Sequence, residues 1–304
     1  MYELMIIGAG PAGLAAAVYA ARKRLNALLL STDIGGQLNN NWGVENYLGF
    51  QFITGPDLID KFRAQVDQFP IEQKIGSRVV RLSHVNGGFE AVSESEERYQ
   101  AKSVLLATGK RPKRLNVPGE AEFSGKGVAY CTICDGPIFA GQRVAVIGGG
   151  NSALEATLDM VKIAEHVDLI APYSLAGDEV LVEKVKEAKN VTVRDCCKVE
   201  RIDGDGLVKS LSMRDTNTDR VTELPVSGIF VEIGLEPSSE IVSGLLQVNE
   251  KGEVPVNCSS ETAVPGLFAA GDVTDAPEKQ ILVAAGEGAK ALLRAHRYLK
   301  RLKE

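Results

Sequence analysis

The chain has 304 residues, 44% of them hydrophobic, and a formal net charge of −6. This length exceeds the size at which a single core usually stops growing, so two domains are expected. The acidic balance argues against nucleic acid as a partner, because neutralising phosphates needs a basic face.

Five cysteines and the absence of a signal-like N-terminal stretch fit a reducing compartment, where any disulfide is transient. We therefore expect a cytoplasmic protein. No apolar run reaches the roughly 18 residues that a membrane-spanning helix requires, so a membrane partner is not expected.

The N-terminal segment is typical of a dinucleotide-binding unit. The apolar run 4–7 predicts a strand, a Gly-x-Gly-x-x-Gly loop follows, and the alanine-rich stretch 14–21 predicts a helix. Such loops bind a pyrophosphate through backbone N–H groups at the helix N-terminus. A ribose-binding acid is usually found after the next strand, predicted at 27–30, but Ser31 or Thr32 stands there instead. The predicted contacts in the loop are Gly8, Gly10, Pro11, Ala12 and Gly13.

The next segment combines glycines with side-chain amides. Gly36, Gln37, Leu38 and Asn46 belong to a predicted loop beneath a ligand, whose amides could hydrogen-bond a heteroaromatic edge. An ordinary surface turn is the alternative. A helix is then predicted over 57–69, and short antiparallel strands over 79–82, 88–93 and 98–100.

A further buried strand, 102–107, ends in small residues. Ala107, Thr108 and Gly109 would let the backbone close on a bound dinucleotide. We expect the chain to leave the first domain shortly after this strand.

Cys131 and Cys134 are separated by two residues, a spacing that allows a disulfide made to be reopened. Asp135 follows directly, and its carboxyl could move a proton as the sulfurs exchange electrons. Gly136 and Pro137 predict the start of a short helix, whose N–H groups would favour a thiolate at Cys134. Two alternatives stay open: an inert buried pair, and half of a zinc site, although no second Cys-x-x-Cys exists.

A second strand, glycine loop and helix follow, with the strand predicted at 142–147 and the helix at 154–163. The strand after this helix, 166–170, leads into residues 171–177. The adenosine ribose of a nicotinamide cofactor is expected to bind at this stretch. That stretch has neither an acid for a 2′-hydroxyl nor arginines for a 2′-phosphate. The predicted contacts of the second loop are Gly148, Gly150, Asn151, Ser152 and Ala153.

The C-terminal part completes the first domain. A predicted strand at 266–270 leads to Gly271 and Asp272, and Gln280 and Ile281 precede a helix predicted over 283–299. The aspartate can bind the ribityl hydroxyls of a flavin, and the helix N-terminus can face the polar edge of the isoalloxazine. The fold class is therefore α/β, with two Rossmann-like dinucleotide-binding domains, the second inserted in the first. The predicted boundaries are 1–114 and 245–304 for the FAD-binding domain, and 115–244 for the inserted NAD(P)-binding-like domain.

Taken together, these motifs resemble the low-molecular-weight thioredoxin reductases, and also the reductase portion of the alkyl hydroperoxide reductase flavoprotein subunit. The resemblance covers essentially the whole chain and includes Glu45 to Tyr47 beside the motifs above. It implies a class II pyridine nucleotide-disulfide oxidoreductase, a homodimer with tightly bound FAD. It also implies that Cys134 faces the flavin, that Cys131 attacks the partner disulfide, and that Asp135 is the acid/base.

The resemblance further implies that electrons pass from a nicotinamide cofactor through FAD and the disulfide to thioredoxin or a thioredoxin-like protein. It predicts a rotation of the two domains, with hinges near 115–119 and 236–243. Members that use NADPH carry histidine and arginine after the second strand of the inserted domain, and 171–177 has none, which favours NADH.

Two alternative functions stay open. One keeps the fold but takes electrons from ferredoxin or another donor, and the second is a flavin-binding module that senses redox state without catalysis. No metal is predicted, and Cys196 and Cys197 are expected to be packing residues.

Overall fold

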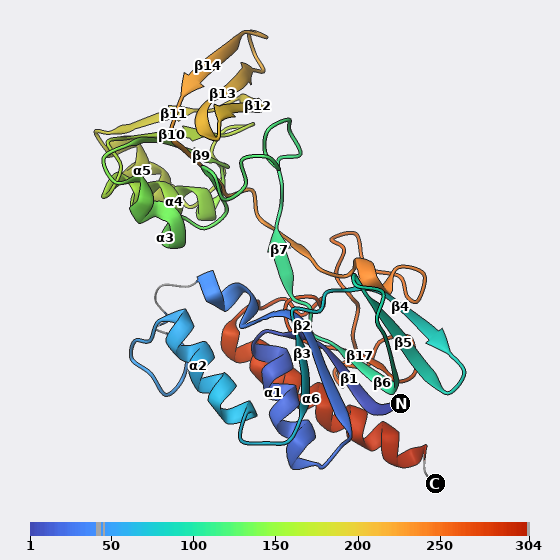
Figure 1. The fold of residues 1–304 in the computed structure, drawn as a ribbon. Coiled ribbons are helices and arrows are strands. Elements are labelled where there is room, and N and C mark those ends of the chain that lie inside the picture. The colour runs from blue at the N-terminus through green and yellow to red at the C-terminus, as the bar shows by residue number, and fades with distance from the viewer. Residues whose placement is uncertain (41–43, 45, 303–304) are drawn as a thin grey trace. The chain divides into compact units, whose positions relative to one another are not determined.

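The computed structural model describes residues 1–40, 44 and 46–302, with the side chains of Asn40, Ile133 and Cys134 outside the description. The chain forms two compact units, Met1–Arg111 with Glu236–Glu304, and Pro112–Leu235. Strands β7 (Lys110–Pro112) and β16 (Leu235–Pro237) carry the chain between them and form a two-stranded sheet (Figure 1). The second unit is thus inserted in the first, as predicted.

The first unit is built on a seven-stranded sheet in the order β3-β2-β1-β6-β5-β4, with β17 paired to β6. The segment 4–7 of β1 is apolar because both of its faces are buried: Leu4 and Ile6 enter one core, and Met5 and Ile7 enter the other. The strands are β1 (Tyr2–Ala9), β2 (Ala27–Ile34), β3 (Glu72–Ile75), β4 (Val79–Val85), β5 (Gly88–Ser93), β6 (Arg98–Leu106) and β17 (Leu267–Ala269).

Helices α1 (Pro11–Arg22) and α6 (Ile281–Arg301) share one core of the first unit, so the C-terminal helix packs on the N-terminal one. Their backbones approach closely at Gly288, where a Cβ would lie 1.9 Å from the Ala12 carbonyl oxygen. The remaining helical segments of this unit are α2 (Gly55–Val66) and the 3₁₀ turns η1 (Gly36–Asn40) and η3 (Glu240–Val242).

The second unit contains a five-stranded parallel sheet in the order β11-β10-β9-β15-β8, and a separate antiparallel sheet, β12-β13-β14. One face of the parallel sheet is covered by α4 and α5, and the other shares a core with the antiparallel strands. Its elements are β8 (Val128–Ala129), α3 (Thr132–Asp135), η2 (Gly136–Phe139), β9 (Arg143–Ile147), α4 (Asn151–Val161), β10 (His166–Ile170), α5 (Glu179–Glu187), β11 (Val191–Arg194), β12 (Cys197–Asp205), β13 (Leu207–Asp215), β14 (Val221–Pro225) and β15 (Gly228–Val231).

The structure draws the boundaries between the units at 111/112 and 235/236, earlier in the chain than the predicted 114/115 and 244/245. Residues after 235 belong to the first unit because the Ser238 N–H donates to the Gly109 carbonyl and Arg111 pairs with Glu236, both at 2.9 Å.

The stretch 115–119, expected to be a hinge, is instead bound tightly within the second unit. The Ile202 N–H donates to the Pro118 carbonyl at 3.0 Å, and a Cβ at Gly119 would lie 2.0 Å from the Ile202 carbonyl oxygen. The crossings between the units are therefore confined to the short strands β7 and β16.

Candidate active site

The first glycine loop is shaped by close backbone approaches. A Cβ at Gly8 (φ 107°) would lie 2.2 Å from the Ala107 carbonyl oxygen, and one at Gly13 would lie 1.8 Å from the Gly8 carbonyl oxygen. Gly10, the N-cap of α1, has its nearest such neighbour 3.9 Å away, and Pro11 opens the helix with no acidic residue in the first turn. The N–H groups at this helix end are therefore placed to bind a phosphate.

Two segments from far along the chain lie beside this loop. A Cβ at Gly36 would lie 3.6 Å from the Gly10 Cα, and one at Gly271 would lie 3.1 Å from the Ala12 Cβ. The Gln37 amide Nε2 donates to Asp272 Oδ2 at 3.3 Å and joins the two segments. The pKa of Asp272 is raised by burial, with Lys279 acting in the opposite direction. The glycine loop and the uncapped N-terminus of α1 fit the pyrophosphate of FAD. The carboxyl of Asp272 fits its ribityl group.

Other predicted contacts of the first unit hold the surrounding loops. Asn46 Nδ2 donates to Gln280 Oε1 at 3.0 Å, directly before Ile281 opens α6. Leu38 is 2% exposed and belongs to a small core rather than to the surface of the loop. Glu45, part of the resemblance, lies outside the described residues.

Thr108 and Gly109 tie the end of β6 to the return crossing. Thr108 Oγ1 donates to the Ser238 carbonyl at 2.6 Å, and the Gly109 carbonyl accepts from the Ser238 N–H. Together with Ala107, which faces Gly8, they close one side of the first loop.

The sequence pattern did not identify an acid at the end of the second strand. Because β2 runs to Ile34 and not to residue 30, it includes Asp33. Ser31, which stands where the ribose-binding acid was expected, accepts the Ala9 N–H at 3.1 Å and so supports β1. Asp33 Oδ1 accepts the Gly36 N–H at 2.9 Å beside the glycine loop. An acid two residues before a Gly-Gly pair was the signal that could have identified it.

Cys131 is disulfide-bonded, whereas Cys196, Cys197 and Cys258 are free. The side chain of Cys134, the second member of the predicted pair, lies outside the described residues.

The helical structure around the pair differs in part from the prediction. A short 3₁₀ helix does begin at Gly136, as predicted, but α3 precedes it, starts at Thr132 and contains Cys134. Cys134 therefore lies within a helical turn and not directly before one. The Asp135 N–H donates to the Cys131 carbonyl at 3.1 Å and closes this turn.

The segment that contains Cys131 and Cys134 is fixed to the rest of the second unit by the residues directly after it. A Cβ at Gly136 would lie 2.9 Å from Met160 Sδ on α4, so any larger residue would require the buried Met160 side chain to shift. The Phe139 ring packs edge-on against Phe230, with 5.5 Å between centroids. Burial raises the pKa of the Asp135 carboxyl, which helps it hold a proton at the site.

The second glycine loop repeats the backbone geometry of the first. A Cβ at Gly148 (φ 146°) would lie 2.2 Å from the Glu232 carbonyl oxygen, while Gly150, the N-cap of α4, has no such neighbour within 4 Å. Asn151 is engaged elsewhere: its Nδ2 donates to Asp178 Oδ2 at 3.1 Å, and its Oδ1 accepts the Asp178 N–H at 2.7 Å. Among the other predicted contacts, Ser152 is exposed and Ala153 is buried.

The stretch expected to read the adenosine ribose, 171–177, carries no cationic residue. Two arginines flank β10 in the sheet, but both are used by the fully buried Asp168. Arg143 Nε and Arg194 Nε donate to its two carboxylate oxygens at 2.8 and 2.7 Å. We call the loop 148–153 and the stretch 171–177 the second cradle, and the loop 8–13 with its neighbouring segments the first. The stretch 171–177 of the second cradle therefore does not match a 2′-phosphate.

Glu232 is a second acidic residue beside a glycine loop that the sequence motifs did not identify. It follows β15, and its pKa is raised to about 7 by burial and then by repulsion from Glu155. Its backbone closes on Gly148, so this carboxyl belongs to the surroundings of the second loop. A glutamate at the end of an otherwise apolar strand was the sequence signal.

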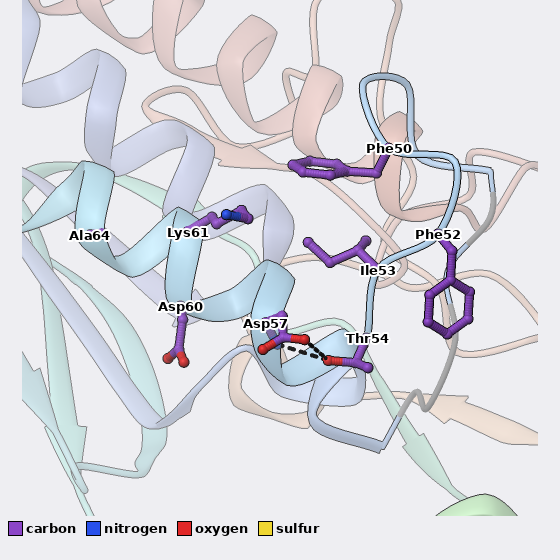
Figure 2. A pocket seen from close by; sticks show the side chains of 8 residues that line it. All are labelled: Phe50, Phe52, Ile53, Thr54, Asp57, Asp60, Lys61 and Ala64. Carbon is purple, nitrogen blue, oxygen red and sulfur yellow. Dashed lines mark hydrogen bonds between the residues drawn. The ribbon is translucent and has the colours of Figure 1, made fainter.

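A separate cavity of about 550 Å³ lies at the start of α2 in the first unit. Figure 2 shows Phe50 and Phe52 on the preceding loop and Lys61 on the helix, with Thr54 bonded to Asp57 at its N-terminus. None of the predicted site residues lines it, so we place the redox site elsewhere. In the described part of the chain, no cluster of three or more metal-ligating side chains occurs, and no helix is long and apolar enough to span a membrane.

Residues 2–288 match the family described as pyridine nucleotide-disulphide oxidoreductase. An alkyl hydroperoxide reductase subunit of Staphylococcus aureus (strain MSSA476) is 38% identical over 301 residues, which are 99% of this chain and 59% of that protein. The chain thus spans a little over half the length of the curated relative it matches.

Solved structures are similar over nearly the whole chain. Thioredoxin reductase from Lactococcus lactis, in the FR conformation, has a TM-score of 0.85 and 33% identity, covering 99% of this chain and 100% of that one. A ferredoxin-flavin thioredoxin reductase from Clostridium acetobutylicum has a TM-score of 0.54 and 30% identity, covering 99% and 98%.

The chain belongs to the pyridine nucleotide-disulphide oxidoreductase family and is an oxidoreductase enzyme with a thioredoxin reductase-like fold. The resemblance inferred from the sequence motifs and the predicted fold class are both confirmed. Membership of the family implies FAD and a nicotinamide dinucleotide as cofactors.

Proposed function

We propose that this enzyme passes electrons from NADH, in preference to NADPH, through FAD and the Cys131–Cys134 disulfide to thioredoxin or a thioredoxin-like protein. The observation that carries the proposal is the disulfide-bonded Cys131, whose carbonyl accepts the N–H of Asp135, a residue whose carboxyl has a raised pKa. The similarity to a thioredoxin reductase supports the class of partner.

The proposed reaction converts NADH, a proton and the disulfide of the partner into NAD⁺ and two partner thiols. When bound, FAD supplies the transfer of an electron pair between a hydride donor and a disulfide. In this chain, the disulfide accepts two electrons and two protons and becomes a dithiol.

The partner is then reduced by thiol–disulfide exchange. The Cys131 thiolate attacks one sulfur of the partner disulfide, and the other sulfur leaves with a proton. Cys134 next attacks the mixed disulfide at Cys131, which releases the second partner thiol and restores the internal disulfide. We assign Asp135 the proton transfers at these sulfurs, because burial keeps its carboxyl protonated to a higher pH than usual.

Replacing Cys131 by serine tests the proposal most directly. We expect Cys131→Ser to lower turnover with an oxidised thioredoxin by about a thousandfold or more, because the attacking sulfur is lost. Cys258→Ser is the matched control, since Cys258 is exposed and free. Unchanged turnover in Cys131→Ser would refute the proposal.

The preference for NADH is supported by the absence of a cationic residue in 171–177 and by the engagement of Arg143 and Arg194 with Asp168. An anaerobic titration of the flavin absorbance with NADH, and separately with NADPH, tests it. Bleaching at lower NADH than NADPH concentration is the expected result, and the reverse order would contradict it.

A second candidate donor is reduced ferredoxin. The observation that favours it is Asn151, whose side chain is engaged by Asp178 at the N-terminus of α4, where a pyrophosphate would bind. The similar ferredoxin-flavin enzyme supports this alternative. Bleaching by reduced ferredoxin, with neither nicotinamide effective, would establish it.

The remaining sequence predictions stay predictions: a homodimer, a cytoplasmic location, and no nucleic-acid or membrane partner. Sedimentation of the purified holoenzyme would test the oligomeric state.

A further inference from the structure

Glu120 is a buried carboxylate that the proposed reaction does not use. It is 3% exposed, and it follows Gly119 in the stretch that brings the chain into the second unit. Its described partners are three neutral donors. Leu115 N–H donates to Oε1 at 2.8 Å, Asn116 N–H donates to Oε2 at 2.7 Å, and the Tyr130 hydroxyl donates to Oε1 at 2.9 Å.

These bonds join two different parts of the second unit. Leu115 and Asn116 lie just after the first crossing between the units, and Asn116 adopts a left-handed backbone (φ 57°). Tyr130 follows β8 and directly precedes Cys131. One carboxylate therefore connects the incoming part of the chain to the residue beside the redox-active cysteine.

Arg114 adds a second connection between the same two places. Its guanidinium lies over the Tyr130 ring, 5.3 Å from the centroid, and its Nη1 donates to the Tyr130 hydroxyl at 3.3 Å. Burial and then the bond to Glu120 raise the pKa of Tyr130 to about 12, so the hydroxyl stays a donor at neutral pH. Leu115 and Tyr130 also pack against the same core.

We infer that Glu120 and Tyr130 are positioning residues, forming a clamp that makes the incoming segment 114–116 and the Cys131 segment move as one piece. The inference rests on the proposed function, because its consequence is the delivery of Cys131 to a protein disulfide. A reorientation at the crossing strands then moves Cys131 together with the segment 114–116. When the clamp is broken, this segment can move independently of Cys131.

Tyr130→Phe tests the clamp, because it removes one hydroxyl and keeps the ring under Arg114. Tyr2→Phe is the matched control, since the Tyr2 hydroxyl donates to Glu72 Oε2 at 2.8 Å in the first unit, and its pKa is likewise raised to about 12. Hydrogen exchange of the holoenzyme is measured on peptides covering 112–118. We expect about tenfold faster exchange there in Tyr130→Phe and no change in Tyr2→Phe.

A second readout separates positioning from a merely structural role. We expect Tyr130→Phe to lower kcat with an oxidised bacterial thioredoxin about fivefold at unchanged KM, and to leave reduction of a small aromatic disulfide unchanged, because a small substrate needs no fixed orientation. Equal losses with both substrates, or no loss with thioredoxin, would overturn the positioning role.

Exchange at 112–118 that matches the wild-type rate would overturn the clamp itself. A wild-type enzyme that reduces no thioredoxin would count against the proposed function, while the exchange experiment still decides the clamp. Glu120→Gln is a further variant: its amide keeps the shape but turns one acceptor into a donor, so faster exchange is expected there as well.

Discussion

The two glycine loops have the same local geometry and different surroundings. Gly8 and Gly148 both have a positive φ, and a Cβ at either would lie 2.2 Å from a carbonyl oxygen at the end of a neighbouring strand. The first loop is met by segments from distant parts of the chain, including Asp272 through Gln37. The second is met by the stretch before α5, through Asp178, and by the Glu232 backbone after β15.

This difference suggests a different use of each cradle. Segments that converge from far apart can enclose a ligand on several sides, which suits a tightly held cofactor such as FAD. Among the described residues, no side-chain bond joins the two borders of the second loop as Gln37 joins Asp272, which suits a nucleotide that binds and leaves. Paired variants, one in each cradle, test whether the two are used differently.

The largest effects are expected from Gly8→Ala and Gly148→Ala, which place the same clash in each loop. Backbone strain and overpacking should cost about 3 kcal/mol or more in each unit. We expect Gly8→Ala to lose its flavin absorbance, and Gly148→Ala to retain it while losing reduction by NADH. Loss of flavin from both variants would show that the two cradles do not act separately.

Gly10→Ala and Gly150→Ala should have smaller effects, because the structure leaves room for a Cβ at both positions. A methyl group there obstructs only a phosphate approaching the helix N-terminus, with an expected weakening of about tenfold to a hundredfold. FAD content should fall in Gly10→Ala alone. The affinity for NADH, measured by calorimetry, should fall in Gly150→Ala alone.

Glu232 provides a pH-dependent contrast between the two cradles. Its folded pKa of about 7 lies above the ordinary value of 4.5, so the folded state binds the proton more tightly than the unfolded state does. Stability is therefore lost as pH rises from about 4.5 through 7. Glu232→Gln should be about 1–2 kcal/mol more stable than the wild type at pH 8 and nearly equal to it at pH 4.5, after allowance for solvent screening.

Urea unfolding at the two pH values measures this difference. A stabilisation of the same size at both would mean that packing, and not ionisation, separates the glutamine variant from the wild type.

The smallest effect is expected from adding one cation to the second cradle. Tyr173 is 79% exposed within the stretch 171–177, so Tyr173→Arg should be accommodated. We expect KM for NADPH to fall about fivefold with KM for NADH unchanged, because one exposed charge pair contributes modestly. Tyr173→Gln is the uncharged control, and an equal change in that variant would refute the electrostatic explanation.

Much of the architecture was determined locally and could be predicted from the sequence. Strand, glycine loop and helix recur at Gly8 and at Gly148 because each is encoded by consecutive residues: an apolar run, a glycine-rich loop and a helix-forming stretch. The Cys131 to Asp135 segment was equally evident, since its chemistry depends on residues that are neighbours in the chain. The predicted site residues of the first unit include distant ones, Gln37 and Asp272, that the structure brings into contact.

Tertiary contacts decided the rest. Residues 115–119 looked like a linker by position, yet the bond to Ile202 and the bonds of Glu120 fix them in the second unit. Asp33, Glu232 and the Asn151–Asp178 pair were not recognised because the role of a polar side chain depends on which distant backbone or carboxyl it meets. Local pattern thus determined the folds of the two units, and packing determined where each begins and how each cradle is bordered.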